Sequence, residues 1–148
     1  MEEKLDGKDF ALIEELRKDS KLSEQKLARK TSIPMTTVHN RLRKLRGLGV
    51  ITGYTVRLDH AKLGRPLTAY ILLKAAPGAD QKRLLSQMAG MPLVCEAAIV
   101  AGSEFDIVLK ARAPGLKDLN DMVVDGLRGH KGVVDSRMMI SYECIDNE

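Results

Sequence analysis

The chain has 148 residues, enough for one domain or two small ones, and 44% of them are hydrophobic. With two Phe, three Tyr and no Trp, any core must be built mainly from aliphatic side chains and Met. Residues 1–60 hold 13 Lys/Arg and 9 Asp/Glu, whereas residues 61–148 hold 11 of each, so the net charge of +4 lies entirely in the first part. This asymmetry indicates two parts with different functions.

Composition and spacing exclude several classes of protein. Cys95 and Cys144 are far apart and belong to no Cys/His cluster, so two reduced thiols, at least one of them buried, are expected rather than a disulfide framework or a zinc site. His39, His60 and His130 are isolated, so no metal and no cofactor is predicted. No segment has the apolar run of a signal peptide or the ~18 apolar residues of a membrane span, so we expect a soluble cytoplasmic protein with no membrane partner.

One segment of the first part, residues 25–58, contains no Asp or Glu. It carries eight basic residues, which are Lys26, Arg29, Lys30, Arg41, Arg43, Lys44, Arg46 and Arg57. Positive charge at this density is unfavourable in a compact fold unless a negatively charged partner lies against it. The same segment has the pattern of a helix, a short turn and a second helix, so double-stranded DNA is the expected partner.

Capping residues and apolar spacing predict three helices in this part. Asp6 can cap a first helix over residues 7–18, and Ser23 can cap a second helix that ends near Thr31. The third helix is predicted over residues 34–46, because it begins with a proline suited to a first helical turn and is followed by a Gly-Leu-Gly run.

The third helix has two distinct faces when its residues are projected at 100° each. The predicted inward stripe consists of Pro34, Met35, Val38, Leu42 and Leu45. Residue types that can read DNA lie on the opposite side and its shoulders. Side chains near the N-terminus of such a helix reach furthest into the major groove, so the predicted base readers are Thr36, Thr37, His39 and Asn40.

The basic residues of this helix are assigned different roles. Arg43, Lys44 and Arg46 are predicted to contact phosphates, where they set affinity and salt dependence rather than sequence choice. Two roles remain open for Arg41, a phosphate contact or an ion pair with an acid of the first helix such as Glu14 or Glu15. A merely solvated basic helix is the alternative, which the helix-turn-helix pattern disfavours.

The next segment connects two domains. Residues 50–59 are rich in β-formers and predict an extended segment, either a wing or a connecting strand. Residues 60–66 contain Gly and Pro and form the expected hinge. The expected boundaries are therefore a DNA-binding domain over residues 1–59 and a second domain over residues 67–148.

The second domain contains an internal repeat, because residues 71–78 resemble residues 107–115. Each copy leads into a helical pattern and then a β-prone run, over residues 81–88 and 93–100 in the first and 117–127 and 133–142 in the second. Strand-helix-strand twice over predicts a ferredoxin-like βαββαβ sandwich, which makes the whole chain α+β. Such a sheet leaves one face bare, which favours self-association. By pattern alone, the polar turn at residues 101–106 is an ordinary β-hairpin.

With a helix-turn-helix, a hinge and a βαββαβ domain in this order, the chain resembles the Lrp/AsnC family, the feast/famine transcriptional regulators of bacteria and archaea. The similar residues are Leu5-Asp6 with Asp9, Leu27-Ala28, Val38-x-x-Arg41-Leu42-x-x-Leu45, Gly49-Val50-Ile51-Thr52-Gly53-Tyr54, Gly102-x-x-x-Asp106, Gly132-Val133 and Asp135-Ser136-Arg137. Two positions depart from the family pattern: Pro34 stands where many members place a capping Ser, and Ser32 where glycine is common.

The resemblance implies a sequence-specific DNA-binding regulator, with a (winged) helix-turn-helix and a RAM-type effector and oligomerisation domain, and no catalytic residues. It implies a homodimer, often assembled into octamers, on a near-palindromic operator, and a small effector, commonly an amino acid, bound between subunits. The positions it nominates for the effector are Gly102, Ser103, Glu104, Phe105, Asp106, Asp135 and Ser136. A carboxylate such as Asp106 or Glu104 would hold an α-amino group. Two alternatives remain open, a tetrapyrrole decarboxylase of the same layout and a chromatin-like DNA binder of low specificity.

Overall fold

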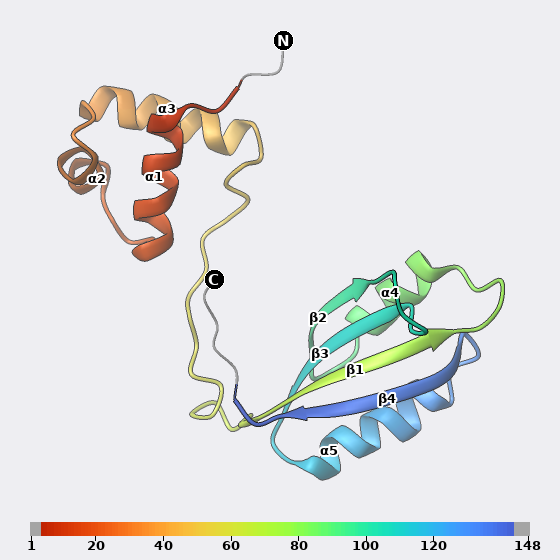
Figure 1. The fold of residues 1–148 in the computed structure, drawn as a ribbon. Helices are drawn as coiled ribbons and strands as arrows, with labels where there is room; N and C mark the ends of the chain where they lie inside the picture. The colour runs from red at the N-terminus through yellow and green to blue at the C-terminus, as the bar shows by residue number, and fades with distance from the viewer. Residues whose placement is uncertain (1–3, 144–148) are drawn as a thin grey trace. The chain divides into compact units, whose positions relative to one another are not determined.

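The structure, a computed structural model, describes residues 4–143, which form two compact units divided in sequence between Arg57 and Leu58. The first unit contains three helices, α1 (Gly7–Lys18), α2 (Glu24–Thr31) and α3 (Met35–Gly47). Their bounds confirm the three predicted helices to within about a residue, and Figure 1 shows them as one small bundle.

The predicted capping residues begin the first two helices. The carboxylate of Asp6 accepts hydrogen bonds from the backbone N–H groups of Lys8 and Asp9, and the Asp9 carboxylate accepts one from the N–H of Asp6. This reciprocal capping box satisfies N–H groups that have no partner within a helix. Ser23 caps α2 by accepting from the N–H of Lys26. α3 begins without a side-chain cap, because Pro34 occupies its N-cap.

The core of this unit lies where the three helices meet. Val38, Leu42 and Leu45 of α3 are buried there with Leu12, Leu27 and Ile33, as the inward stripe predicted for the first three. Pro34 and Met35 were wrongly assigned to this stripe, since both are exposed. Pro34 is in an extended conformation outside the helix, so the helical projection does not apply to it. Ile33, in the turn before α3, is buried in the same core.

Ser32 ends α2 in the left-handed region, with φ 56° and ψ 31°. A residue with a Cβ is strained there, whereas glycine is not. We expect Ser32→Gly to stabilise the first unit by about 0.5–1 kcal/mol, measured by urea unfolding followed through hydrogen exchange of its amides. Ser20→Gly is the matched control, because Ser20 lies in a turn without a positive φ and its replacement should not stabilise. Equal effects of the two substitutions would contradict this explanation.

The segment between the units is not a strand. Residues 52–59 belong to no helix or strand, so the predicted wing or connecting strand is not formed within the described chain. A β-prone run becomes a strand only where another backbone pairs with it, and no described strand does so here. The side chains of Tyr54, Val56 and Leu58 are consequently exposed.

The second unit contains a four-stranded antiparallel sheet in the order β2-β3-β1-β4 (Figure 1). Its elements are β1 (Leu67–Ala75), α4 (Gln81–Ala89), β2 (Val94–Ile99), β3 (Ile107–Ala113), α5 (Leu116–Asp121), the π-helical turn η1 (Met122–Arg128) and β4 (Val133–Ser141). This order is the predicted ferredoxin-like βαββαβ fold. The single helix predicted over residues 117–127 is divided into α5 and η1, which continue one another.

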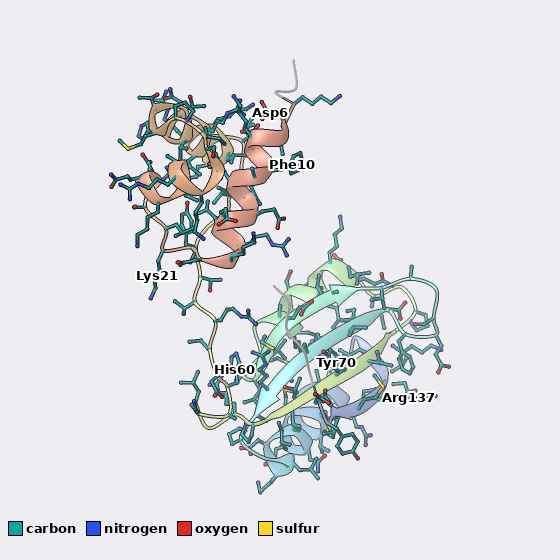
Figure 2. All side chains as sticks on the ribbon, turned by 60° about the vertical axis from the view of Figure 1, so that its left-hand side comes forward. Asp6, Phe10, Lys21, His60, Tyr70 and Arg137 are labelled. Atoms are coloured by element: carbon teal, nitrogen blue, oxygen red, sulfur yellow. The ribbon has the colours of Figure 1, made fainter. Side chains whose placement is uncertain are left out.

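Alternation along the strands separates two faces of the sheet. Ala69, Ile71 and Leu73 of β1 are buried with Ile107 and the other inward residues of β3 against α4, α5 and η1. The opposite face carries Tyr70 of β1, paired in register with Met139 of β4, and Leu72, paired with Arg137. Figure 2 labels Tyr70 and Arg137 on this sheet. No described helix covers that face, so self-association through it stays a prediction.

The expectation that at least one of the two thiols is buried depends on Cys144, because Cys95 is exposed. Cys95 lies on the edge strand β2, and its thiol donates to the carbonyl of Lys110. A strand at the edge of the sheet has one side without a neighbour, which explains the exposure. Cys144 lies outside the described residues. Within residues 4–143, no helix is long and apolar enough to cross a membrane.

Candidate nucleic-acid interface and ligand site

The outward side of α3 presents the predicted polar residues. Thr36, His39, Asn40 and Arg43 are exposed, and Thr37 is half-buried. They stay outside because Val38, Leu42 and Leu45 turn the opposite side of the helix into the core. An open groove of about 600 Å³ runs beside them, lined by Asp6, Thr37, Asn40, Arg41, Arg43, Lys44, Gly47 and Leu48.

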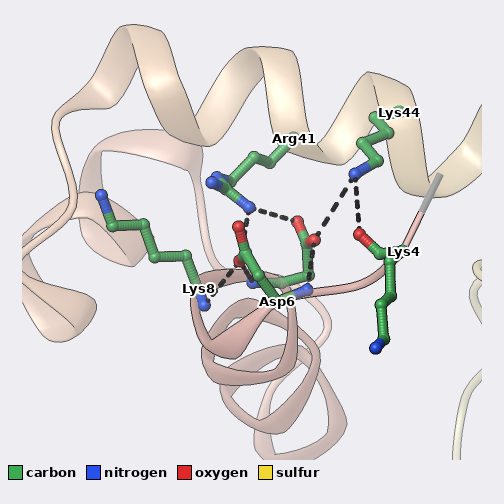
Figure 3. A network of polar contacts seen from close by, with 6 residues as sticks. Lys4, Asp6, Lys8, Arg41 and Lys44 are labelled. Atoms are coloured by element: carbon green, nitrogen blue, oxygen red, sulfur yellow. Dashed lines mark hydrogen bonds and ion pairs between the residues drawn. The ribbon is translucent and has the colours of Figure 1, made fainter.

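Arg41 is held by acids of α1 and its cap. Its Nη1 lies 2.6 Å from Oδ1 of Asp6 and 2.8 Å from Oδ1 of Asp9. Figure 3 shows the Arg41 side chain directed at Asp6. Of the two roles left open for Arg41, the structure therefore contains the ion pair, but with Asp6 and Asp9 instead of the expected Glu14 or Glu15. Arg41 contacts acids at the N-terminus of α1, whereas Glu14 and Glu15 lie more than one turn further along that helix.

Asp9 is fully buried and binds a second cation as well. Its Oδ2 lies 3.8 Å from Nζ of Lys44, which also donates to the backbone carbonyl of Lys4 at 3.5 Å (Figure 3). A buried carboxylate is costly unless it is paired and hydrogen-bonded, and here it has two cations and a backbone N–H. Lys44, predicted as a phosphate contact, is thus partly engaged within the domain.

Other acids also neutralise the basic segment. Glu15 pairs with Lys18 and with Lys30, which lies on α2. The expectation that only an external partner neutralises this segment is therefore wrong in part, because sequence position did not reveal that α1 faces it. Within residues 4–143, Arg43 is exposed and forms no ion pair, and the Arg46 side chain donates to the backbone carbonyl of Leu42 in its own helix. These two remain the most available cations of α3.

The ion pairs predict how stability depends on pH. The hydrogen bond from Arg41 lowers the pKa of Asp6, and hydrogen bonds from Lys18 and Lys30 lower the pKa of Glu15. A lowered carboxyl pKa in the folded state contributes stability above about pH 4, where unfolded carboxyls titrate, and this contribution is lost as the pH falls through the folded value. The midpoint temperature of thermal unfolding should therefore fall as the pH is lowered from about 7 to about 3. In the double variant D6N/E15Q, this fall should be smaller.

His39 contacts α2. Its Nδ1 lies 3.1 Å from Oε1 and 3.1 Å from Oε2 of Glu24, the first residue of that helix. Asn40, beside it, is exposed and lines the groove. These two of the four predicted base readers are therefore on the accessible side, and His39 is oriented by Glu24, which no pattern in the sequence indicated.

The predicted effector residues lie in the turn between β2 and β3 and at the start of β4. Gly102 has φ 91°, a conformation that favours glycine, and the hydroxyl of Ser103 accepts from the N–H of Phe105 and donates to its carbonyl. The turn is thus ordered by its own hydrogen bonds, in agreement with the ordinary hairpin that the pattern alone indicated.

Asp106 is already occupied inside the domain. Its carboxylate accepts from the backbone N–H of Ala75 at 2.8 Å and from Nε2 of Gln81 at 3.1 Å, so it joins the turn to the end of β1 and the start of α4. Asp106 was expected to be available for an α-amino group, but these two donors already occupy its carboxylate. The pattern could not show this, because Ala75 and Gln81 are more than twenty residues away.

Glu104 and Phe105 meet a residue outside the predicted set. Arg137 of β4 lies 3.1 Å from Glu104 and its guanidinium stands 5.1 Å from the centre of the Phe105 ring. Ser136, its neighbour, points to the other side of the sheet, where it is buried and Nε of Arg128 donates to it at 3.5 Å. Asp135 accepts from the N–H of Ser136. The structure therefore brings Glu104 and Phe105 together with Arg137, but not with Ser136. Strand alternation between 136 and 137 could have indicated this division.

A helix-turn-helix unit with a polar, basic outer face, joined to a ferredoxin-like unit, defines a two-domain DNA-binding regulator. Residues 5–46 match the AsnC-type helix-turn-helix domain, and residues 68–147 match the Lrp/AsnC ligand binding domain. The chain therefore belongs to the Lrp/AsnC family of transcriptional regulators, as its motifs indicated.

Individual relatives agree with this assignment over nearly the whole chain. An HTH-type transcriptional regulator of Pyrococcus furiosus is 39% identical over 150 residues, covering 100% of this chain and 99% of the relative. The leucine-responsive regulatory protein of Rhizobium meliloti is 33% identical, covering 95% and 91%. The structure of Bacillus subtilis LrpC superimposes with a TM-score of 0.85 at 30% identity, covering 98% of this chain and 99% of that one.

Proposed function

We propose that this protein regulates transcription as a homodimer, placing α3 of each subunit in successive major grooves of a near-palindromic operator, about 34 Å apart. The DNA-binding domain comprises residues 1–59, the hinge residues 60–66, and the effector and oligomerisation domain residues 67–148. Further assembly into octamers belongs to the same proposal, and the protein acts in the cytoplasm.

One observation supports the DNA-binding role above the others. The capped helices and the buried side of α3 fix its polar side outward, where Thr36, Asn40 and Arg43 are exposed together. Hydroxyl, amide and guanidinium groups on one helix side suit base edges and phosphates. Asn40 is the candidate for bidentate pairing with adenine, and Arg43 and Arg46 for phosphate contacts.

The effector site is proposed at the turn between β2 and β3. Of the two carboxylates expected to hold an α-amino group, Asp106 is engaged, so Glu104 is the candidate that remains, once it exchanges Arg137 for the ligand. Arg137 would then be free to take the α-carboxylate. A match to the ligand binding domain of the family over residues 68–147 supports an amino-acid-like effector, and one relative is named leucine-responsive.

Selection of bound fragments from random DNA, with and without a panel of amino acids, tests this function. We expect a two-fold symmetric consensus and an affinity that at least one amino acid changes by roughly 5- to 150-fold, the usual range of allosteric coupling. Binding without a consensus would replace the regulator by a low-specificity, chromatin-like binder. No binding at low salt would overturn both.

We also propose that the chain has no catalytic role, since its relatives are named as regulators. The alternative is a tetrapyrrole decarboxylase of the same layout. Adding a tetrapyrrole to the purified protein should leave the tetrapyrrole absorbance unchanged, and a bound or converted chromophore would support the enzyme instead.

A further inference from the structure

The pair of Glu24 and His39 connects the two helices of the helix-turn-helix. Glu24 is the first residue of α2, behind the Ser23 cap, and His39 lies in the second turn of α3. The contact is supported from within by Leu27 and Val38, which are buried in the same core. The distances from Nδ1 to the two carboxylate oxygens are equal, at 3.1 Å.

This contact determines which nitrogen of His39 carries the proton. An ionised carboxylate can only accept hydrogen bonds, so Nδ1 must be the donor. In a neutral imidazole, the other nitrogen is then an acceptor. Nε2 of His39 forms no hydrogen bond with any residue between 4 and 143, and 57% of the side chain is exposed. When His39 is neutral, α3 thus presents a lone pair of electrons on its accessible side.

An acceptor selects among bases by the donors they expose. In the major groove only adenine, through N6, and cytosine, through N4, present an amino donor, whereas the exocyclic oxygens of guanine and thymine are acceptors. The same acceptor would repel a phosphate oxygen. The tautomer therefore decides whether His39 reads a base or holds the backbone.

We propose that Glu24 is a positioning residue that fixes His39 with an acceptor Nε2, and that His39 thereby selects an adenine or a cytosine at one position of each half-site. This rests on the proposed DNA-binding function and adds to it the class of base that His39 recognises. Glu24 itself touches no DNA in this arrangement.

The tautomer is testable without DNA. Long-range ¹H–¹⁵N correlation spectra of the full-length protein, recorded at about pH 8 where imidazoles are normally neutral, should show Nδ1 of His39 protonated and Nε2 unprotonated. Glu24→Ala should remove this preference for a proton on Nδ1. A protonated Nε2 in the unsubstituted protein would overturn the inference.

The base preference is tested on the site selected by the unsubstituted protein. Its adenines and cytosines are replaced singly by purine or 2-pyrimidinone, which lack the amino group. At one position per half-site, we expect the analogue to weaken binding roughly 3- to 10-fold, as for one hydrogen bond. His39→Ala should bind the natural and analogue sites equally, whereas His60→Ala, which changes a histidine of the hinge, should still discriminate.

Glu24 variants separate positioning from charge. Glu24→Gln keeps the length of the side chain but can accept or donate, so the preference at this position should weaken, while loss of the negative charge raises affinity for all sequences alike. Unchanged discrimination in both Glu24→Gln and Glu24→Ala would overturn the role of Glu24. If the unsubstituted protein instead preferred guanine or thymine at this position and His39→Ala lost that preference, the acceptor role of Nε2 would be overturned. Absence of any DNA binding would instead overturn the proposed function.

Discussion

Replacing Asp9 with alanine is expected to destabilise the helix-turn-helix unit by about 3 kcal/mol, within the range for breaking a buried ion pair. Asp9 is fully buried, and its carboxylate joins Arg41, Lys44 and the N–H of Asp6. Without it, both cations lose their interior partner and α1 loses half of its capping box. The measurement is hydrogen exchange of the full-length protein in increasing urea, which reports each unit separately.

The expected result is local. Amides of α1, α2 and α3 should lose protection, whereas those of the β1–β4 sheet should keep theirs. Glu14→Ala is the matched control, because Glu14 is an exposed acid of the same helix, paired with the equally exposed Arg17 at 3.6 Å, and should cost less than about 0.5 kcal/mol. Similar losses for the two variants would show that Asp9 acts merely as one more negative charge.

The double variant R43A/R46A is expected to weaken binding to every DNA sequence by roughly 10- to 100-fold near physiological salt. Each phosphate contact adds about 0.9 to the slope of log affinity against log salt, so the slope should fall by about 1.8. Arg43 and Arg46 are the relevant pair because Arg41 and Lys44 are held by Asp9. Binding titrations at several salt concentrations, on the selected site and on random DNA, measure both quantities.

A matched variant, K82A/R83A, removes the same charge from the exposed side of α4 in the second unit. It should leave the slope within error of the unsubstituted protein. A loss in R43A/R46A confined to the selected site would mean that these arginines read bases, and an unchanged slope would remove them from the interface.

Local signals in the sequence were sufficient for the elements and their order. Asp6 and Ser23 cap the helices they were expected to cap, because a cap depends only on the next three residues. The repeat in the second part predicted the βαββαβ order, since strand alternation and helical spacing are properties of short segments. The outward side of α3 followed from the same spacing. Residues 52–59 show the limit, because a β-prone segment without a paired backbone forms no strand.

The sequence by itself determined the fold, the family and the side of α3 that faces outward, because these depend on periodicity and on ordered motifs. Only the tertiary structure decided which charges remain available. Asp9 engages Arg41 and Lys44 from more than thirty residues away, Ala75 and Gln81 engage Asp106, and Glu24 orients His39. Such pairs form only where particular turns of separate elements pack together, and the spacing of residues along the chain does not show which turns these are.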